Sequence, residues 1–149
     1  MKKYYLAYGS NLNKTQMNYR CPDAKAIGTA YLNDYELLFK GSKTGSYLTV
    51  EKKKGSKVPL GVWEVSNEDE MNLDIYEGYP NFYYKKNIEI EVTKFNGDKE
   101  KLNAFIYIMH EDHKIGIPTN YYIYVCAEGY KDFGFNNKYL ANALELARG

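Results

Sequence analysis

The pentapeptide YGSNL at residues 8–12 joins an apolar run to a helix-like segment, and its residue types suit the binding of oxygen atoms. Glycine lets another group approach the backbone closely, and the N–H groups at a helix start have no partner within the helix. Such N–H groups bind anionic oxygens. The same residues also fit a plain strand-to-helix turn in which Asn11 or Asn13 caps the helix, so the local sequence leaves both roles open.

Glu77 stands in the last turn of a helical segment that begins at Ser66, directly before Gly78. A carboxylate there faces the negative end of the helix dipole, where a cation would be more stable. Its aromatic neighbours are Tyr76, Tyr79, Phe82, Tyr83 and Tyr84. Burial among these rings and the dipole both raise the pKa of the carboxyl, which suits a group that transfers protons near neutral pH. The alternative is an exposed glutamate that tolerates an unfavourable position.

Other candidate chemistry is weaker. His110 and His113 have the H-x-x-H spacing of a metal site, but they lie in a polar segment and the chain has no further histidine or paired cysteine. Cys126 lies within an apolar run, so a Cys–His nucleophilic pair is not favoured. Ser10 is not part of a G-x-S-x-G elbow. We therefore expect neither a metal centre nor an enzymic nucleophile.

The composition fits one compact domain of 149 residues with nearly balanced charge. The 20 Lys and Arg against 19 Asp and Glu give no indication of a nucleic-acid or membrane partner. Cys21 and Cys126 are far apart in sequence, and residues 1–10 lack the apolar run of a signal peptide. We expect free thiols and a cytoplasmic location. No stretch approaches the ~20 apolar residues of a membrane helix.

The expected strands have hairpin spacings and cover residues 3–8, 29–32, 35–39, 47–51, 60–65, 83–94 and 102–109. We predict that Asn33-Asp34 is a two-residue link, that the Lys-rich segment Glu51–Lys57 is a hairpin tip, and that Asn96-Gly97 is a hairpin turn. The expected helices cover residues 12–19, 67–77, 121–127 and 137–147. In the second of these, Met71 and Ile75 share one face. The prediction is an α+β fold in a single domain, residues 1–149: a small mixed, mostly antiparallel β-barrel with flanking helices.

The sequence resembles the γ-glutamylcyclotransferase-like family, which includes the γ-glutamylamine cyclotransferases and the plant AIG2-like proteins. The resemblance covers nearly the whole chain and is carried by the segments YGSNL, QMNYRCPDA, GTAYLNDYELLF, PLGVWEV, LDIYEGYPNFYYKK, AFIYIM and PTNYYIYVCAEGYKDFGF. The most specific feature is YGSNL followed by an aromatic-flanked Glu-Gly pair. The same barrel fold is expected from this similarity.

By this resemblance Glu77 is the acid/base residue, and the turn holds the γ-glutamyl group. The implied substrate-binding residues are Tyr8, Gly9, Ser10, Asn11, Leu12, Tyr83 and Tyr122. Tyr84 adjoins Tyr83, so the alignment leaves open which of the two lines the pocket. Tyr122 follows Pro118-Thr119, where relatives have a Pro-Ser pair.

The family reaction needs no enzymic nucleophile, because the substrate's own α-amine attacks its γ-carbonyl. This attack forms 5-oxoproline and expels an amine or amino acid. One carboxyl can act first as base and then as acid, while an oxygen-binding turn stabilises the developing oxyanion. The resemblance thus implies a cofactor-independent enzyme for a small γ-glutamyl substrate, monomeric or homodimeric, with the leaving amine unidentified.

Two other readings remain open at this stage. A non-catalytic protein on the same fold could bind a γ-glutamyl or amino-acid ligand without converting it, although the presence of Glu77 argues against this. An interaction protein would need many of its 17 tyrosines in an exposed patch rather than in a cavity.

Overall fold

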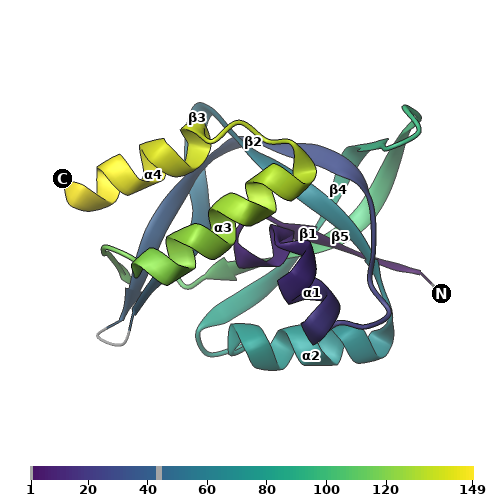
Figure 1. Ribbon diagram of the computed structural model, residues 1–149, viewed down its shortest axis with the longest axis horizontal. Helices are drawn as coiled ribbons and strands as arrows, with labels where there is room; N and C mark the ends of the chain where they lie inside the picture. Colours follow the sequence, from purple (N-terminus) through teal and green to yellow (C-terminus); the bar gives the residue numbers. More distant parts are fainter. Residues whose placement is uncertain (1, 43–44) are drawn as a thin grey trace.

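The computed structural model describes residues 2–42 and 45–149 (Figure 1). Its elements follow in the order β1 (Lys3–Ala7), the 3₁₀ turn η1 (Ser10–Leu12), α1 (Lys14–Arg20), β2 (Lys25–Ser42), β3 (Gly45–Val65), α2 (Asn67–Glu77), β4 (Tyr83–Lys94), β5 (Lys99–Met109), β6 (Lys114–Ile115), α3 (Asn120–Phe133) and α4 (Lys138–Arg148). None of the helices described is both long and apolar enough to cross a membrane.

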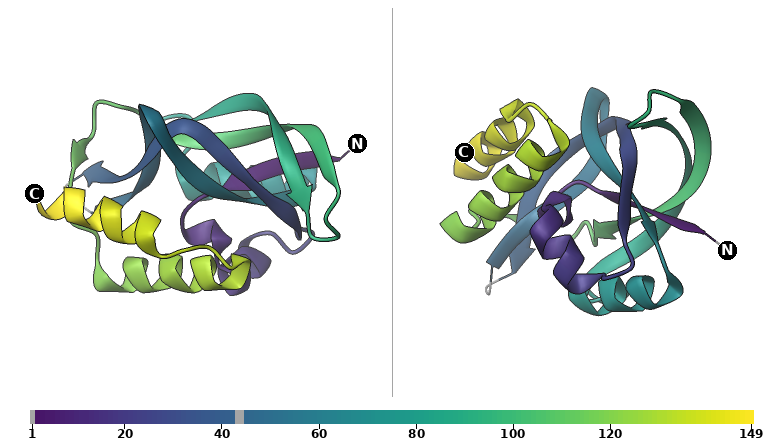
Figure 2. Two further views of the ribbon diagram at one scale, coloured as in Figure 1. Left: turned by 90° about the horizontal axis from the view of Figure 1, so that it is seen from above. Right: turned by 45° about the vertical axis from the view of Figure 1, so that its right-hand side comes forward.

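The sheet closes on itself. Its strand order is β3-β1-β5-β4-β2-β6, and β2 also pairs with β3, so the first five of these strands form a ring. Only the β1–β5 contact is parallel among the pairings described; the others are antiparallel. The helices lie outside the ring, with α3 against η1, α4 along β2, and α1 beside α2 (Figures 1 and 2). The predicted fold class is confirmed.

The core fills the ring and the space beneath α3. Its largest fully buried side chains are Trp63, Tyr107, Tyr130, Phe39, Leu6, Leu12, Met17, Leu48, Leu60, Leu73, Ile106 and Met109. Trp63 connects this core to the η1 turn, because its indole Nε1–H donates a hydrogen bond of 3.0 Å to the carbonyl of Asn11. The position of the turn is therefore fixed from inside the barrel.

The helix predicted after Ser66 is confirmed at both ends. The Ser66 hydroxyl accepts a hydrogen bond from the Asp69 N–H, and the Asp69 carboxylate accepts one from the Ser66 N–H, which forms a capping box. Gly78 ends the helix in the left-handed conformation with φ 63°. The shared face of Met71 and Ile75 is not a packing face, because these side chains are 64% and 80% exposed.

The predictions for the segment between residues 28 and 65 were partly wrong. Asn33-Asp34 is not a link and Glu51–Lys57 is not a hairpin tip, because β2 and β3 run through these positions as one long antiparallel pair. The register shifts at Asn33/Tyr35, where Asp34 has φ 63° and its carboxylate accepts the N–H of Gly55 at 3.0 Å. Residue types typical of turns thus form an irregularity in both paired strands at this point. The sequence alone does not distinguish such a bulge from a turn.

The other local signals were interpreted correctly. Asn96-Gly97 joins β4 to β5, with Gly97 at φ 96°. Asn13, one of the two cap candidates, is the N-cap of α1, since its side chain accepts the N–H of Gln16 at 3.1 Å. The two closing helices both form, and α3 extends further than predicted, to Phe133.

Gly129 allows α3 to touch the η1 turn. A Cβ atom there would lie 2.6 Å from the backbone nitrogen of Asn13 and 2.7 Å from the carbonyl carbon of Leu12. We expect Gly129→Ala to lower the free energy of unfolding by about 1–3 kcal/mol, because the backbone contact must open. Urea denaturation measures this, with Lys131→Ala on the exposed face of the same helix as control. An unchanged Gly129→Ala protein would contradict the close approach, because alanine is otherwise the better helix former.

Candidate active site

A cavity opens where the η1 turn meets the C-terminal end of α2. Its inner recess is small, with a volume of about 20 Å³, and is lined by Tyr5, Tyr8, Gly9, Ser10, Asn11, Leu48, Glu77, Tyr83, Tyr107 and Tyr122. The outer pocket has a volume of about 390 Å³ and is lined by Ser10, Tyr47, Ile75, Tyr76, Glu77, Gly78, Phe82, Tyr83 and Tyr122. Residues from β1, η1, β3, α2, β4, β5 and α3 therefore contribute to one space.

The structure brings Glu77 and the turn to the same cavity. Glu77 is the last residue of α2 and lines both recess and pocket, while Gly9, Ser10 and Asn11 line the recess. Leu12 was implied as a binding residue, but its side chain is fully buried in the core and is not among those that line either space. Leu12 thus anchors the η1 turn to the core and does not line the cavity.

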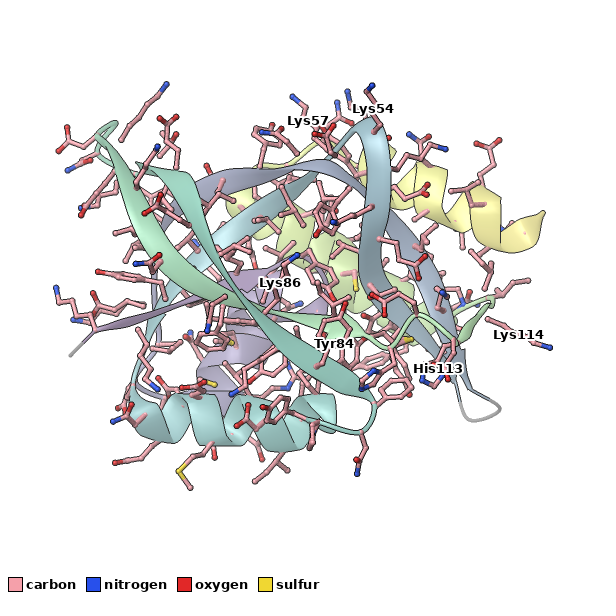
Figure 3. The ribbon with its side chains drawn as sticks, turned by 180° about the vertical axis from the view of Figure 1, so that it is seen from behind. Lys54, Lys57, Tyr84, Lys86, His113 and Lys114 are labelled. Atoms are coloured by element: carbon pink, nitrogen blue, oxygen red, sulfur yellow. The ribbon has the colours of Figure 1, made fainter. Side chains whose placement is uncertain are left out.

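Tyr83 and Tyr84 are consecutive residues of β4, so their side chains point to opposite faces of the strand. Tyr83 lines the cavity, and its hydroxyl donates to the carbonyl of Leu48 at 2.8 Å. Tyr84 points to the opposite side of the strand, where its hydroxyl donates to the carboxylate of Glu111 on the face shown in Figure 3. Tyr83 is therefore the pocket residue.

Two further predicted tyrosines lie in the recess with their hydroxyls held by backbone. Tyr8 donates to the carbonyl of Tyr107 at 2.6 Å, and the Tyr122 hydroxyl accepts the N–H of Leu48 at 3.0 Å. A Cβ atom on Gly9 would lie 3.2 Å from that Tyr122 hydroxyl. Glycine at this position thus keeps the turn close to the tyrosine without crowding it.

The η1 turn presents backbone donors. Its internal hydrogen bonds run from Leu12 N–H to the Gly9 carbonyl and from Asn13 N–H to the Ser10 carbonyl. Among the hydrogen bonds of the described residues, none uses the N–H of Ser10 or Asn11. These are the unpaired donors expected at a helix start, and here they belong to residues that line the recess.

Arg20 links the turn to α2. Its guanidinium donates to the side-chain carbonyl of Asn11 at 2.7 Å and lies 3.6 Å from the ring centre of Tyr76. The Tyr76 hydroxyl in turn hydrogen-bonds the Ser10 hydroxyl at 2.9 Å. Two contacts, both made by Tyr76, thus hold the end of α2, which carries Glu77, over the turn.

Burial dominates the acid–base behaviour of the cavity. It raises the pKa of Glu77 to about 8, and the positive charge of Arg20 opposes this shift only in part. Burial is also the first cause that raises the pKa of Tyr8, Tyr83 and Tyr122 well above the ordinary tyrosine value. Near neutral pH the tyrosines are therefore neutral hydrogen-bonding groups, while Glu77 exchanges its proton.

The sequence did not indicate several of the lining residues. Tyr5, Leu48 and Tyr107 reach the recess because β1, β3 and β5 come together only in the closed ring. Tyr47 and Phe82 form the outer wall from segments far apart in the chain, with ring centres 6.1 Å apart. Tyr76 and Phe82 did have a sequence signal, because both belong to the aromatic neighbours of Glu77.

The alternative reactive groups lie elsewhere. A ring nitrogen of His110 hydrogen-bonds the Pro80 carbonyl at 2.8 Å, and His113 packs against the Phe82 ring with centres 4.9 Å apart. The described residues contain no group of three or more His, Cys, Asp or Glu that could hold a metal ion. Cys21 and Cys126 are buried free thiols, and burial raises the pKa of each to about 12. Neither thiol is in a state suited to nucleophilic attack.

Residues 5–127 match the family described as "Gamma-glutamyl cyclotransferase, AIG2-like". A curated relative from Bos taurus, "Gamma-glutamylcyclotransferase", is 30% identical over 142 residues, which cover 91% of this chain and 73% of the relative. The protein of the same name from Homo sapiens is 28% identical over the same shares of each chain.

Solved structures agree with these matches. A structure described as "Gamma-glutamyl cyclotransferase" superposes with a TM-score of 0.80 at 26% identity, covering 96% of this chain and 86% of that chain. YkqA from Bacillus subtilis, at 16% identity and a TM-score of 0.77, shares the fold over 99% of this chain and 55% of its own. Since the family match spans most of the residues and the fold agrees, the chain belongs to the gamma-glutamyl cyclotransferase, AIG2-like family.

Proposed function

We propose that the protein is a cofactor-independent cyclotransferase that releases 5-oxoproline and a free amine or amino acid from a γ-glutamyl amide, with Glu77 as the proton-transfer residue. The observation that carries this proposal is the placement of Glu77, with its pKa raised to about 8, in one cavity with the unpaired N–H groups of Ser10 and Asn11. The relatives named γ-glutamylcyclotransferase support the same reaction.

The proposed reaction needs no second substrate, because one molecule supplies both the attacking amine and the carbonyl that it attacks. The substrate's α-ammonium gives one proton to the Glu77 carboxylate, and the free α-amine then attacks the γ-carbonyl carbon. A new C–N bond closes the five-membered ring, and the original amide C–N bond breaks. Glu77 returns its proton to the departing nitrogen and then takes the second proton from the ring nitrogen and passes it to the same amine. The products are 5-oxoproline and the protonated amine, with the Glu77 carboxylate restored and no water consumed.

The cavity supplies what this step needs. A carboxyl with a pKa near that of an α-amino group, ~8, exchanges protons with it at little cost in free energy. The N–H groups of Ser10 and Asn11 are suited to the oxyanion that forms at the γ-carbonyl. Holding the glutamyl chain folded within the cavity brings its amine to its own carbonyl, which supplies proximity.

The two other readings have less support. A binding protein that leaves its ligand intact would gain nothing from a carboxyl whose pKa lies near neutrality. An interaction surface made of tyrosines is disfavoured because Tyr5, Tyr8, Tyr83, Tyr107 and Tyr122 line the recess. Neither reading explains why aromatic residues converge on one carboxyl.

We expect Glu77→Gln to lower the rate of 5-oxoproline release by about 10²–10⁴-fold, because glutamine keeps the volume but cannot exchange the proton. The variant should retain the fold and still bind γ-glutamyl compounds, since the turn supplies separate contacts. Steady-state kinetics and calorimetric binding measure the two effects. Glu68→Gln, an exposed position in the first turn of the same helix, is the matched control and should keep full activity. Near-normal turnover by Glu77→Gln would overturn the assignment.

The raised pKa of Glu77 predicts how stability depends on pH. Because the folded protein holds this proton up to about pH 8 and the unfolded chain only to about 4.5, the protonated carboxyl contributes fully below pH 4.5. That contribution is lost as pH rises from 4.5 to 8. Relative to wild type, Glu77→Gln should therefore gain about 4 kcal/mol in unfolding free energy between pH 5 and pH 9. Urea denaturation at both pH values checks this, and a constant difference would show an ordinary pKa.

The proposed step uses neither metal nor thiol. We expect turnover to survive EDTA and iodoacetamide, because Cys21 and Cys126 are buried and the histidines lie outside the cavity lining. Loss of turnover in EDTA that zinc restores would instead indicate a metal-dependent reaction. Assays with and without each reagent, at equal protein concentration, decide this.

A further inference from the structure

The described hydrogen bonds account for the hydroxyl protons of three of the five tyrosines that line the recess. Tyr8 and Tyr83 donate to backbone carbonyls, and Tyr107 donates to a carboxylate of α2. A hydroxyl has one proton, so these three have none left for a ligand. Tyr122 accepts a backbone N–H and is already among the expected binding residues. The fifth tyrosine, Tyr5, has no role in the function proposed above.

Tyr5 stands at the end of a hydrogen-bond chain whose direction is set by Arg20. The Arg20 guanidinium donates to the side-chain carbonyl of Asn11 at 2.7 Å, and the Asn11 NH₂ group donates to the Tyr5 hydroxyl at 3.1 Å. A guanidinium has donors only, so the Asn11 oxygen must face Arg20 and the NH₂ group must face Tyr5. The Tyr5 oxygen is therefore an acceptor in this chain, and its own proton remains to be donated.

The Tyr5 hydroxyl is held in the recess as a neutral donor. Its ring packs against the rings of Phe105 and Tyr107, with centres 5.5 Å and 5.8 Å apart, which fixes the position of the hydroxyl. Burial raises the pKa of Tyr5 well above the ordinary value, and the charge of Glu77 raises it further. Among the hydrogen bonds of residues 2–42 and 45–149, none has the Tyr5 hydroxyl as donor to another side chain or to backbone.

The size of the recess limits what this proton can meet. The recess has a volume of about 20 Å³, and a single water molecule needs about 10–15 Å³ of such space. A glutamyl chain must therefore lie in the outer pocket, which has about 390 Å³, and can place only one atom in the recess. Ser10 and Asn11, whose N–H groups are unpaired, line the same recess. The substrate atom that gains negative charge during ring closure, the γ-carbonyl oxygen, suits this set of donors.

We infer that Tyr5 is a catalytic residue whose hydroxyl donates a hydrogen bond to the γ-carbonyl oxygen as it becomes an oxyanion, and that Arg20 is a positioning residue that directs this donor through Asn11. The inference rests on the proposed cyclotransferase function. Tyr5 transfers no proton, because Glu77 moves the protons. Its hydrogen bond strengthens when the amine attacks and the oxygen becomes charged, and weakens again when the amide C–N bond breaks.

Removal of one hydroxyl tests the role of Tyr5. Tyr5→Phe keeps the ring, and we expect kcat for 5-oxoproline release to fall about 10²-fold while KM changes little, because the donor acts mainly on the oxyanion. The assay uses γ-glutamyl-L-alanine and γ-glutamylethylamine as substrates. Tyr4→Phe is the matched control, since Tyr4 precedes Tyr5 on β1, points to the opposite side of the strand and is not among the residues that line the cavity. Tyr4→Phe should keep full turnover.

The outcomes separate this inference from the proposed function. A wild-type kcat in Tyr5→Phe, or a raised KM at unchanged kcat, would overturn the role of Tyr5. The cyclotransferase function would still stand if Glu77→Gln lost turnover in the same assay. Release of 5-oxoproline from neither compound by the wild-type protein would reject both.

Combined variants test whether Arg20 acts through the donor. Arg20→Met leaves the Asn11 amide free to turn, so we expect kcat to fall about 10-fold, the value of about one hydrogen bond. In the Tyr5→Phe background the same change should cost at least about threefold less, because the donor that Arg20 directs is absent. Arg20→Lys, which also has donors only, should recover part of the lost kcat. Equal losses in both backgrounds would show that Arg20 only holds α2 over the turn, and would overturn its assigned role.

Discussion

The arrangement of this end of the barrel depends on one constraint: the Glu77 carboxyl is held at the C-terminal end of α2, where its charged form is unfavourable. Glu77 closes α2, where burial and the helix dipole both oppose its charge. The helix would relieve this by moving outward, but Arg20 stacks on Tyr76 and bonds Asn11, and Tyr76 bonds Ser10. The same contacts that hold the helix also fix the turn opposite. The raised pKa of Glu77 is thus a property of the assembled barrel end and not of the residue.

The N-terminal cap of α2 and its contacts with three strands also hold the helix in place. The capping box at Ser66 satisfies the first N–H groups, and Glu70 pairs with Lys3 of β1 and Lys85 of β4. Tyr107 of β5 donates to Asp74. Partly buried pairs of this kind hold a helix in register even where each adds little free energy. α2 is therefore positioned by β1, β4 and β5, the strands whose Tyr5, Tyr83 and Tyr107 also line the recess.

Local sequence signals predicted most helices and strands, but they did not predict which residues line the cavity. Ser66, Gly78 and Asn96-Gly97 specify their caps and turn through short-range chemistry, so those predictions were confirmed. Asn33-Asp34 failed because a bulge and a turn need the same backbone freedom. The family resemblance suggested Glu77 and the YGSNL turn. Tyr5, Leu48 and Tyr107 could not be predicted, because only ring closure brings their strands together.

The division of the cavity also separates what is constrained from what can change. Residues of the recess are held by backbone partners or by the core, as with Tyr8, Tyr83 and Asn11. The outer wall is less constrained, since Ile75 is largely exposed and Tyr47 partly so. A substitution in the recess would disturb the barrel end, whereas one at Ile75 or Tyr47 would change mainly the surface of the outer pocket. The outer wall can therefore vary in sequence while Glu77 and the turn stay in place.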